Sequence, residues 1–210
     1  MTKTSPRRVA ALAAALAAAT LLSACAPLLV GGAFAGTALM VSDRRTSGTQ
    51  VEDQAIELKA LTRIRETVGD RGHVNATSYS RLVLLTGEVP SDADKAAVEQ
   101  AIGRVENVRS IVNELAVMGS SSLTSRSNDT ILTSKVKASF VDAKDVFANA
   151  FKVITERGTV YLMGRVTERE ANRASDIARG VSGVQKVVRV FEVISEAELA
   201  DVQPKQAPKQ

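Results

Sequence analysis

Side chains that could perform catalysis are few in this chain, and they do not stand at catalytic spacings. His73 is the only histidine; it lies at the start of a predicted strand, and no metal-binding cluster accompanies it. The acidic pairs Asp92/Asp94 and Glu168/Glu170 stand beside predicted helix starts, where carboxylates favour the helix dipole. A structural role explains each of these residues. The sequence therefore predicts a protein that is not an enzyme and that holds no metal or cofactor.

The remaining candidates are two glycines and two tyrosines. Gly87 and Gly164 each lie between a strand and a helix, outside any G-x-G-x-x-G or P-loop pattern, so a backbone turn explains them better than a phosphate site. Tyr79 and Tyr161 are too sparse to stack nucleobases. Without residues 1–24 the chain carries 24 Lys/Arg against 23 Asp/Glu, a net charge of +1, so the sequence predicts no nucleic-acid partner.

The single cysteine stands where a lipoprotein would need it. A positively charged N-terminal region precedes the apolar run Val9–Leu22, which has signal-peptide length and is too short for a comfortable membrane span. The sequence Leu22-Ser23-Ala24-Cys25 then resembles the bacterial lipobox, whose cysteine becomes the acylated first residue. The alternative is an ordinary buried cysteine behind an uncleaved anchor. We expect residues 1–24 to be a signal peptide and Cys25 to be the lipid-attachment site.

The residues after Cys25 predict a membrane tether. Pro27–Val41 is apolar, but it is shorter than the roughly 20 residues that span a bilayer. Ser42–Gln50 continues as a polar linker. Ala26 stands where an aspartate would signal retention in the inner membrane. We therefore expect a lipid-anchored protein in the outer membrane that faces the periplasm.

The rest of the chain contains one unit twice. Gly87 pairs with Gly164 at an offset of 77 residues, and after Pro90 the offset is 76, as for Ser91 and Thr167. Each copy has an apolar strand, the glycine, a capped helix and a valine-rich strand. Ser91 with Asp94 resembles a capping box, and Thr167 with Glu170 has the full pattern.

Upstream of each glycine, the spacing predicts a helix and a hairpin. The helices are expected over Ala55–Thr67 and Asp129–Val141. The fold class is therefore α+β, with two tandem α-β-β-α-β domains, each with two helices packed on a three-stranded mixed sheet. The buried stripes of the first helices are expected to be Leu58, Leu61 and Ile64 in one copy and Leu132, Val136 and Phe140 in the other; the last strands are expected over Arg109–Val117 and Gln185–Ile194.

Three segments of the second copy carry a family resemblance. Asp129-Thr-Ile-Leu-Thr-Ser-Lys135-Val-Lys137, then Gly158-Thr-Val-Tyr-Leu-Met-Gly164-Arg-Val, then Val181-Ser-Gly183-Val184-Gln-Lys-Val-Val resemble the BON domain, and the first copy matches less closely. Two such domains behind a lipoprotein signal resemble the dual-BON outer-membrane lipoproteins of Gram-negative bacteria. The resemblance implies binding of anionic phospholipid and support of outer-membrane integrity, without catalysis.

The boundaries follow from the repeat. We expect a signal peptide over 1–24, a lipidated tether over 25–50, BON domains over 51–118 and 128–195, a serine-rich linker over 119–127 and a disordered tail over 196–210. Residues 51–118 carry 8 Lys/Arg against 11 Asp/Glu, a net charge of −3, whereas residues 126–194 carry 12 against 8, a net charge of +4. The second domain is therefore the one suited to an anionic surface.

The resemblance implies that the lipid site lies on the first helix of the second domain. If Leu132, Val136 and Phe140 face the core, a neighbouring stripe holds the exposed residues, and two further lysines reach the same side. The predicted phospholipid-binding residues are Ile131, Lys135, Lys137, Ala138 and Lys144, and the predicted ligands are phosphatidylglycerol and cardiolipin. An ordinary solvated helix face is the alternative reading of the same residues.

A different class of function is also compatible with the sequence. In this alternative the protein is a periplasmic docking module for outer-membrane assembly machinery. The acidic first domain or the strand edges would then bind the partner, and the charge of the second domain would be ordinary solvated surface.

Overall fold

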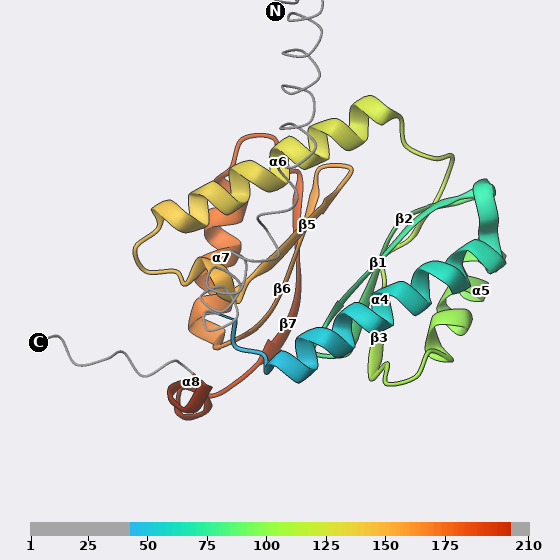
Figure 1. Ribbon diagram of the computed structural model, residues 1–210. Coiled ribbons are helices and arrows are strands. Elements are labelled where there is room, and N and C mark those ends of the chain that lie inside the picture. Colours follow the sequence, from blue (N-terminus) through green and yellow to red (C-terminus); the bar gives the residue numbers. More distant parts are fainter. Residues whose placement is uncertain (1–42, 203–210) are drawn as a thin grey trace, which may run out of the picture. The chain divides into compact units, whose positions relative to one another are not determined.

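The computed structural model describes residues 43–202, which form two domains of the same construction (Figure 1). Cys25 and the tether up to residue 42 lie outside the described residues, as do residues 203–210. The first domain consists of α4 (Ser47–Val68), a 3-10 turn (Gly69–Arg71), β1 (His73–Tyr79), β2 (Leu82–Val89), α5 (Asp92–Gly103), β3 (Ser110–Asn113) and β4 (Ala116–Val117). The second consists of α6 (Leu123–Asp142), a 3-10 turn (Ala148–Ala150), β5 (Lys152–Glu156), β6 (Thr159–Val166), α7 (Glu168–Gly180) and β7 (Lys186–Val193), followed by α8 (Glu196–Val202).

Each sheet is mixed, as expected. In the first domain β1 pairs antiparallel with β2, and β2 pairs parallel with β3; in the second, β5, β6 and β7 repeat this order. The expected third strand Arg109–Val117 is interrupted after Asn113, whose side chain accepts the amide of Leu115, so β3 and β4 pair with β2 separately. The α+β class and the α-β-β-α-β order are confirmed.

An aspartate on the first helix of each domain holds the following hairpin. The carboxylate of Asp53 accepts the amides of Ser80 and Arg81, both at 2.8 Å. The carboxylate of Asp129 accepts the equivalent amides of Arg157 and Gly158 at 2.8 and 2.9 Å. The helix is thereby fixed in rotation against the sheet, so these bonds decide which helix face is buried.

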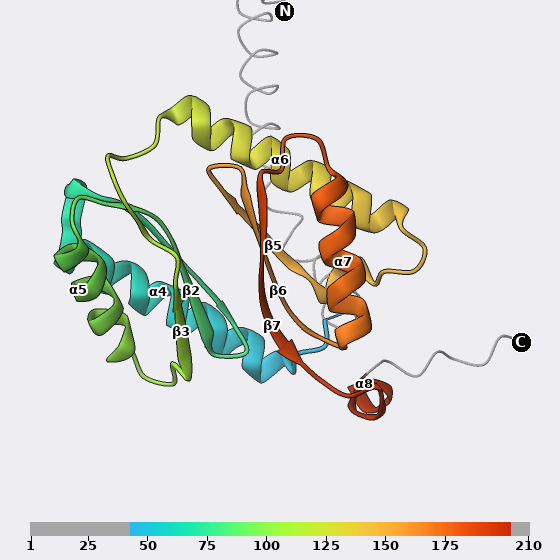
Figure 2. The ribbon, with the colours of Figure 1, turned by 180° about the vertical axis from the view of Figure 1, so that it is seen from behind.

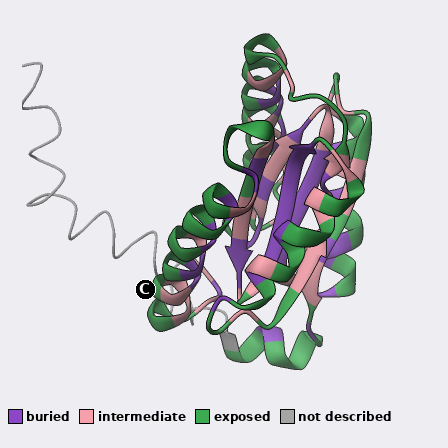
Figure 3. Ribbon diagram, turned by 90° about the vertical axis from the view of Figure 1, so that its right-hand side faces the viewer, coloured by how far each residue is buried: buried purple, intermediate pink, exposed green. Residues whose placement is uncertain are grey.

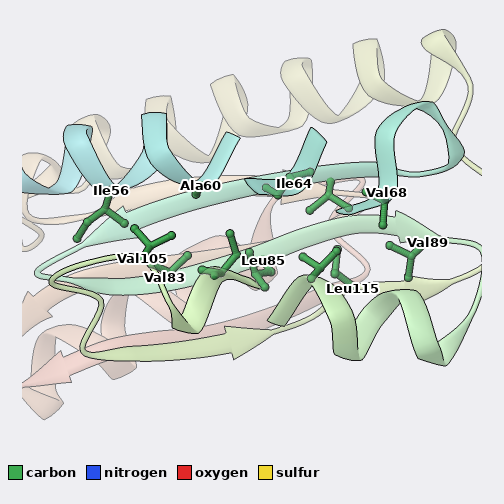
Figure 4. Packing of buried hydrophobic residues seen from close by; sticks show 12 residues of the cluster. Ile56, Ala60, Ile64, Val68, Val83, Leu85, Val89, Val105 and Leu115 are labelled. Carbon is green, nitrogen blue, oxygen red and sulfur yellow. The ribbon is translucent and has the colours of Figure 1, made fainter. Parts of the chain in front are cut away.

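The core of the first domain uses only Ile64 of the expected stripe of α4. Ile56, Ala60, Ile64 and Val68 point into the core, together with side chains from the strands (Figure 4). Leu58 and Leu61 were expected in that core but are 69% and 44% exposed. The helix carries two apolar stripes, and the bonds of Asp53 place the stripe of Ile56 inside.

The core of the second domain matches the expectation. Leu132, Val136 and Phe140 are buried, and the Phe140 and Phe151 rings lie 5.3 Å apart between centroids. The capping box of α7 is complete: Thr167 accepts the amide of Glu170, and the Glu170 carboxylate accepts the amide of Thr167. Figure 2 shows α6 and α7 beside the strands of their sheet.

Three expected boundaries are wrong. The linker 119–127 is shorter, because Ser122 caps α6 by accepting the amide of Ser125 and the helix begins at Leu123. The tether 25–50 ends earlier, because Thr46 caps α4 in the same way. The segment 196–210 was expected to be disordered, but it begins with α8: the Ser195 amide donates to the Glu198 carboxylate, and the Glu198 amide donates to the Ser195 hydroxyl.

The two sheets share an apolar cluster formed by the strand faces that point away from the helices. Along β2, Val83 and Leu85 point into the first core while Leu84, between them, belongs to the shared cluster. The buried members of this cluster are Tyr79, Leu84, Tyr161, Met163 and Val190. Figure 3 shows buried residues on the strands and exposed residues on the outer faces of the helices. The helices therefore form the outer layers and the sheets the inner ones.

Candidate functional site

Helix α6 exposes four apolar side chains on the side opposite its core residues, interspersed with the exposed polar residues Ser127, Thr130 and Ser134. Leu123, Ile131 and Val141 are 78%, 55% and 73% exposed, and Ala138 is also exposed. At about 100° per residue these four positions fall within one side of the helix, opposite Val136. We call Leu123, Ile131, Ala138 and Val141 the α6 ridge. Ile131 and Ala138 were predicted as site residues, whereas Leu123 and Val141 were not.

Lysines flank the α6 ridge on both sides. Lys135 lies beside Ile131 and Ala138 and lines the same grooves as they do. Lys137 follows Lys135 by about 200° of helical rotation, so it lies on the other flank of the ridge. The expectation that Lys137 shares the side of Lys135 is therefore corrected. Lys144 follows the end of α6 at Asp142 and is exposed.

Most basic side chains of the second domain are neutralised by carboxylates, but these three lysines are not. Arg173 pairs with Asp145 at 2.6 Å, and Arg179 pairs with Asp176 at 2.7 Å. Arg169 and Arg189 pair with Glu196 and Glu168 in the same way. Within residues 43–202, none of the ion pairs involves Lys135, Lys137 or Lys144. The unneutralised positive charge of this domain therefore includes the lysines on and after α6.

The surface beside the ridge is hollowed on the flank of Lys135. An open groove of about 600 Å³ lies between α6 and the turns of the sheet, and Ile131, Lys135 and Gly183 line it. A second depression of about 570 Å³ lies between α6 and α7, where Lys135 and Ala138 meet Arg173. Lys135 therefore stands between two hollows that can accept a bulky polar group beside the apolar ridge.

The equivalent helix of the first domain lacks this arrangement. Position 59, which corresponds to Lys135 when Asp53 is aligned with Asp129, is also a lysine, but its ammonium pairs with Glu106 at 2.6 Å. Position 61, which corresponds to Lys137, is a leucine. The two copies therefore differ at the positions that give α6 its free charge.

The other candidates of the sequence lie apart from this surface. His73 is half-buried at the junction of the domains, where burial and the charge of Arg126 lower its pKa and Glu88 opposes them. Residues 43–202 contain no group of three or more side chains suited to hold a metal ion. A search of the same residues found no helix with the length and apolarity needed to cross a bilayer.

No pattern in the sequence indicates the buried ion pair between Arg44 and the second domain. The Arg44 guanidinium donates two bonds to the Glu170 carboxylate, at 2.7 and 2.8 Å, and a third to the carbonyl of Arg165 at 3.0 Å. The two side chains are 1% and 8% exposed. The 126 residues between the partners explain why no local pattern reveals the pair. A buried Arg44 fixes the start of the first domain to the second.

Comparison with known proteins agrees with this construction. The BON domain family model matches residues 52–119 and 128–195. The chain is 42% identical over 187 residues to "Outer membrane lipoprotein DolP" of Haemophilus influenzae, which covers 87% of this chain and 95% of that protein. It is 29% identical over 154 residues to "21 kDa hemolysin" of Actinobacillus pleuropneumoniae, covering 72% of this chain and 79% of that protein.

A third relative matches a smaller part of the chain. "Osmotically-inducible protein Y" of Escherichia coli is 30% identical over 148 residues, covering 67% of this chain and 72% of that protein. Two matched domains, together with similarity along nearly the whole of one relative, confirm the resemblance found in the sequence. This chain belongs to the BON domain family and carries two BON domains.

Proposed function

We propose that this chain is a non-catalytic lipoprotein, anchored in the outer membrane through Cys25, that binds anionic phospholipid and supports outer-membrane integrity. The observation that carries the proposal is the α6 surface, where an exposed apolar ridge lies between lysines that have no carboxylate partner within residues 43–202. An apolar strip between cations suits the boundary between lipid headgroups and acyl chains. The relative from Haemophilus influenzae is named an outer membrane lipoprotein, which supports the anchored location.

The energies predict weak binding by the α6 surface alone. Each lysine contributes about 1 kcal/mol near an anionic leaflet. Full burial of a side chain such as Ile131 contributes about 1.5–3 kcal/mol, and the ridge residues are already partly covered. The acyl chains on Cys25 would therefore provide attachment, while α6 would select patches rich in phosphatidylglycerol or cardiolipin. Weak binding suits this division, because the anchor keeps the helix close to the lipid.

The test measures binding of the chain without its lipid anchor, from residue 43 onward so that the Arg44 ion pair is kept, to vesicles with and without phosphatidylglycerol. We expect Lys135→Glu with Lys137→Glu to abolish the preference for anionic vesicles, because two attractive charges become repulsive. Ile131→Ser with Val141→Ser is expected to weaken binding at all salt concentrations, since it removes apolar contact.

The matched control is Lys59→Glu with Arg63→Glu, which makes the same change of charge on the first helix of the first domain. Both residues are exposed and paired with Glu106 and Glu66. We expect this control to retain most of the binding. If the α6 and α4 charge variants lose binding equally, net charge rather than the α6 surface is the determinant, and the proposal is wrong.

A further inference from the structure

The first domain has a groove of about 460 Å³ between α4 and the outer edge of β1, which the proposed lipid site does not use. Its helix wall contains the apolar residues Leu58, Leu61 and Ile64 beside Gln54 and Glu57. Its strand wall includes Val74 and Ala76. Leu58 and Leu61 are 69% and 44% exposed. Two exposed leucines beside a strand edge need an explanation, because they contribute little to the core of their own domain.

The strand side of the groove presents backbone groups that have no partner in the sheet. β1 is an outer strand, and the two-residue turn at Ser80 and Arg81 fixes the pairing of Tyr79 with Leu82. Alternate residues of an antiparallel strand direct their N–H and C=O groups away from the neighbouring strand. On β1 these are Val74, Ala76 and Ser78.

Of these three residues, only Ser78 has outward backbone groups that form hydrogen bonds with other parts of the two domains. The Ser78 amide donates to Glu57 Oε1 at 2.8 Å, and its carbonyl accepts from Lys152 Nζ at 3.2 Å. The hydrogen bonds among residues 43–202 include none to the outward backbone groups of Val74 and Ala76. The free stretch of the edge therefore lies directly opposite the exposed leucines.

The fold itself does not require these leucines. When Asp53 is aligned with Asp129, Ser134 and Lys137 of α6 stand where α4 has Leu58 and Leu61. The second domain instead joins helix and strand by a hydrogen bond between the hydroxyls of Thr133 and Thr155, at 2.7 Å. The same framework thus carries polar residues in one copy and an apolar wall in the other.

The geometry points to a docking site for an extended segment of another protein, which would add to β1 as a further strand between α4 and the sheet edge. Val74 and Ala76 are two residues apart, so their outward groups repeat at the spacing at which an extended chain offers its own. Backbone bonds supply affinity in strand addition, and pockets for alternate side chains supply specificity. Leu58 and Leu61 select apolar side chains at alternate positions of the segment.

The charge of the first domain further limits which segments could bind in the groove. Residues 51–118 carry a net charge of −3, which repels an anionic membrane and favours a neutral or basic segment. A lipid tail could contact the leucines but could not satisfy the amides of Val74 and Ala76, because a hydrocarbon offers no acceptor. An extended peptide can contact the leucines with its side chains and can form hydrogen bonds with the backbone edge of β1.

The probe is a library of random dodecamer peptides displayed on phage and selected against the full chain in detergent micelles. We expect the enriched peptides to carry apolar residues at alternate positions without net negative charge. A synthetic peptide of the enriched sequence is expected to shift the NMR signals of the Val74 and Ala76 amides and to protect them from hydrogen exchange.

Two variants test the two walls separately. Leu58→Ser with Leu61→Lys installs the residues of the second domain, and it is expected to weaken the peptide at least tenfold. Ala76→Pro removes one outward N–H at an edge position, where proline is tolerated, and it is expected to have a similar effect. Both variants should keep the circular dichroism spectrum and the cooperative thermal unfolding of the unaltered chain, which shows that they are folded.

Three results would each overturn the inference. The first is an enriched peptide that binds the leucine variant as tightly as the unaltered chain. The second is protection of the Val74 and Ala76 amides by anionic vesicles without peptide. The third is protection of these amides that rises with protein concentration alone, since the occupant would then be a second copy of this chain.

Discussion

Arg44 provides the sharpest test of how the two domains are held together. Its guanidinium is buried, bonds the Glu170 carboxylate through two nitrogens and reaches the Arg165 carbonyl. It also lies over the Phe147 ring, 5.6 Å from the centroid. Arg44→Ala removes all of these contacts and leaves a buried carboxylate with only the amide of Thr167 as partner.

The size of the effect follows from burial. Loss of one partner of a buried ion pair costs about 3–5 kcal/mol, because the remaining charge is left uncompensated. For a chain of this size 1 kcal/mol corresponds to about 2–4 °C in Tm, so we expect Tm to fall by about 6–20 °C. Arg173→Ala is the matched control: it breaks a pair of similar length whose side chains are 50% and 57% exposed, and Tm should hardly change.

The pH dependence distinguishes loss of the ion pair from loss of packing. Burial raises the pKa of Glu170, but the bonds from Arg44 and from the Thr167 amide outweigh it and lower the pKa overall. A carboxyl with a lowered pKa adds stability above its ordinary pKa, and this stability is lost as the pH falls through the folded-state value. Arg44→Ala should therefore flatten the fall of Tm in acid. A variant that keeps the Tm and the acid profile of the unaltered chain would refute the reasoning.

Two further predictions concern the junction of the domains and a backbone contact. Burial, followed by the charge of Glu88, raises the pKa of Glu156, so its ionised form destabilises the fold above the ordinary carboxyl pKa. Glu156→Gln should therefore raise Tm at pH 7 and leave it unchanged below pH 4, as measured by circular dichroism. An added Cβ at Gly87, where φ is +114°, would lie 2.0 Å from the His73 carbonyl oxygen. Gly87→Ala should therefore lower the free energy of unfolding by about 2–4 kcal/mol, as measured in urea. The control Gly180→Ala should hardly change the free energy of unfolding, because nothing lies within 4 Å of the added atom.

The sequence predicts well what depends on local patterns repeated in both copies. The caps at Ser91 and Thr167 and the order of the elements are local, so their residues sufficed. The burial of α4 is different, because its two apolar stripes satisfy the same helical period. Contacts of Asp53 with the hairpin select the stripe of Ile56, and they join residues 27 and 28 positions apart. The Arg44 pair spans a longer interval still and has no local signal.

The serine-rich stretch before α6 shows a second limit. Serine is common both in linkers and at helix N-caps, because its hydroxyl can accept a backbone amide in either setting. Ser122 makes such a bond to the amide of Ser125, so α6 starts at Leu123 rather than after the serines. The longer helix adds Leu123 to the α6 ridge, which is why the apolar part of the candidate site is larger than the five predicted residues indicate.

The packing of the two sheets gives the duplicated helices separate roles. Because Leu84, Tyr161 and their neighbours join the sheets, the faces that carry the helices point outward, and α4 and α6 are both available to partners. The same framework position is Leu61 in α4 and Lys137 in α6, so the copies have diverged at exposed sites while their cores kept the same design. An apolar, acidic domain and a domain with unneutralised lysines suit different ligands. The proposed membrane contact through α6 would therefore leave the groove beside β1 free to bind a second molecule.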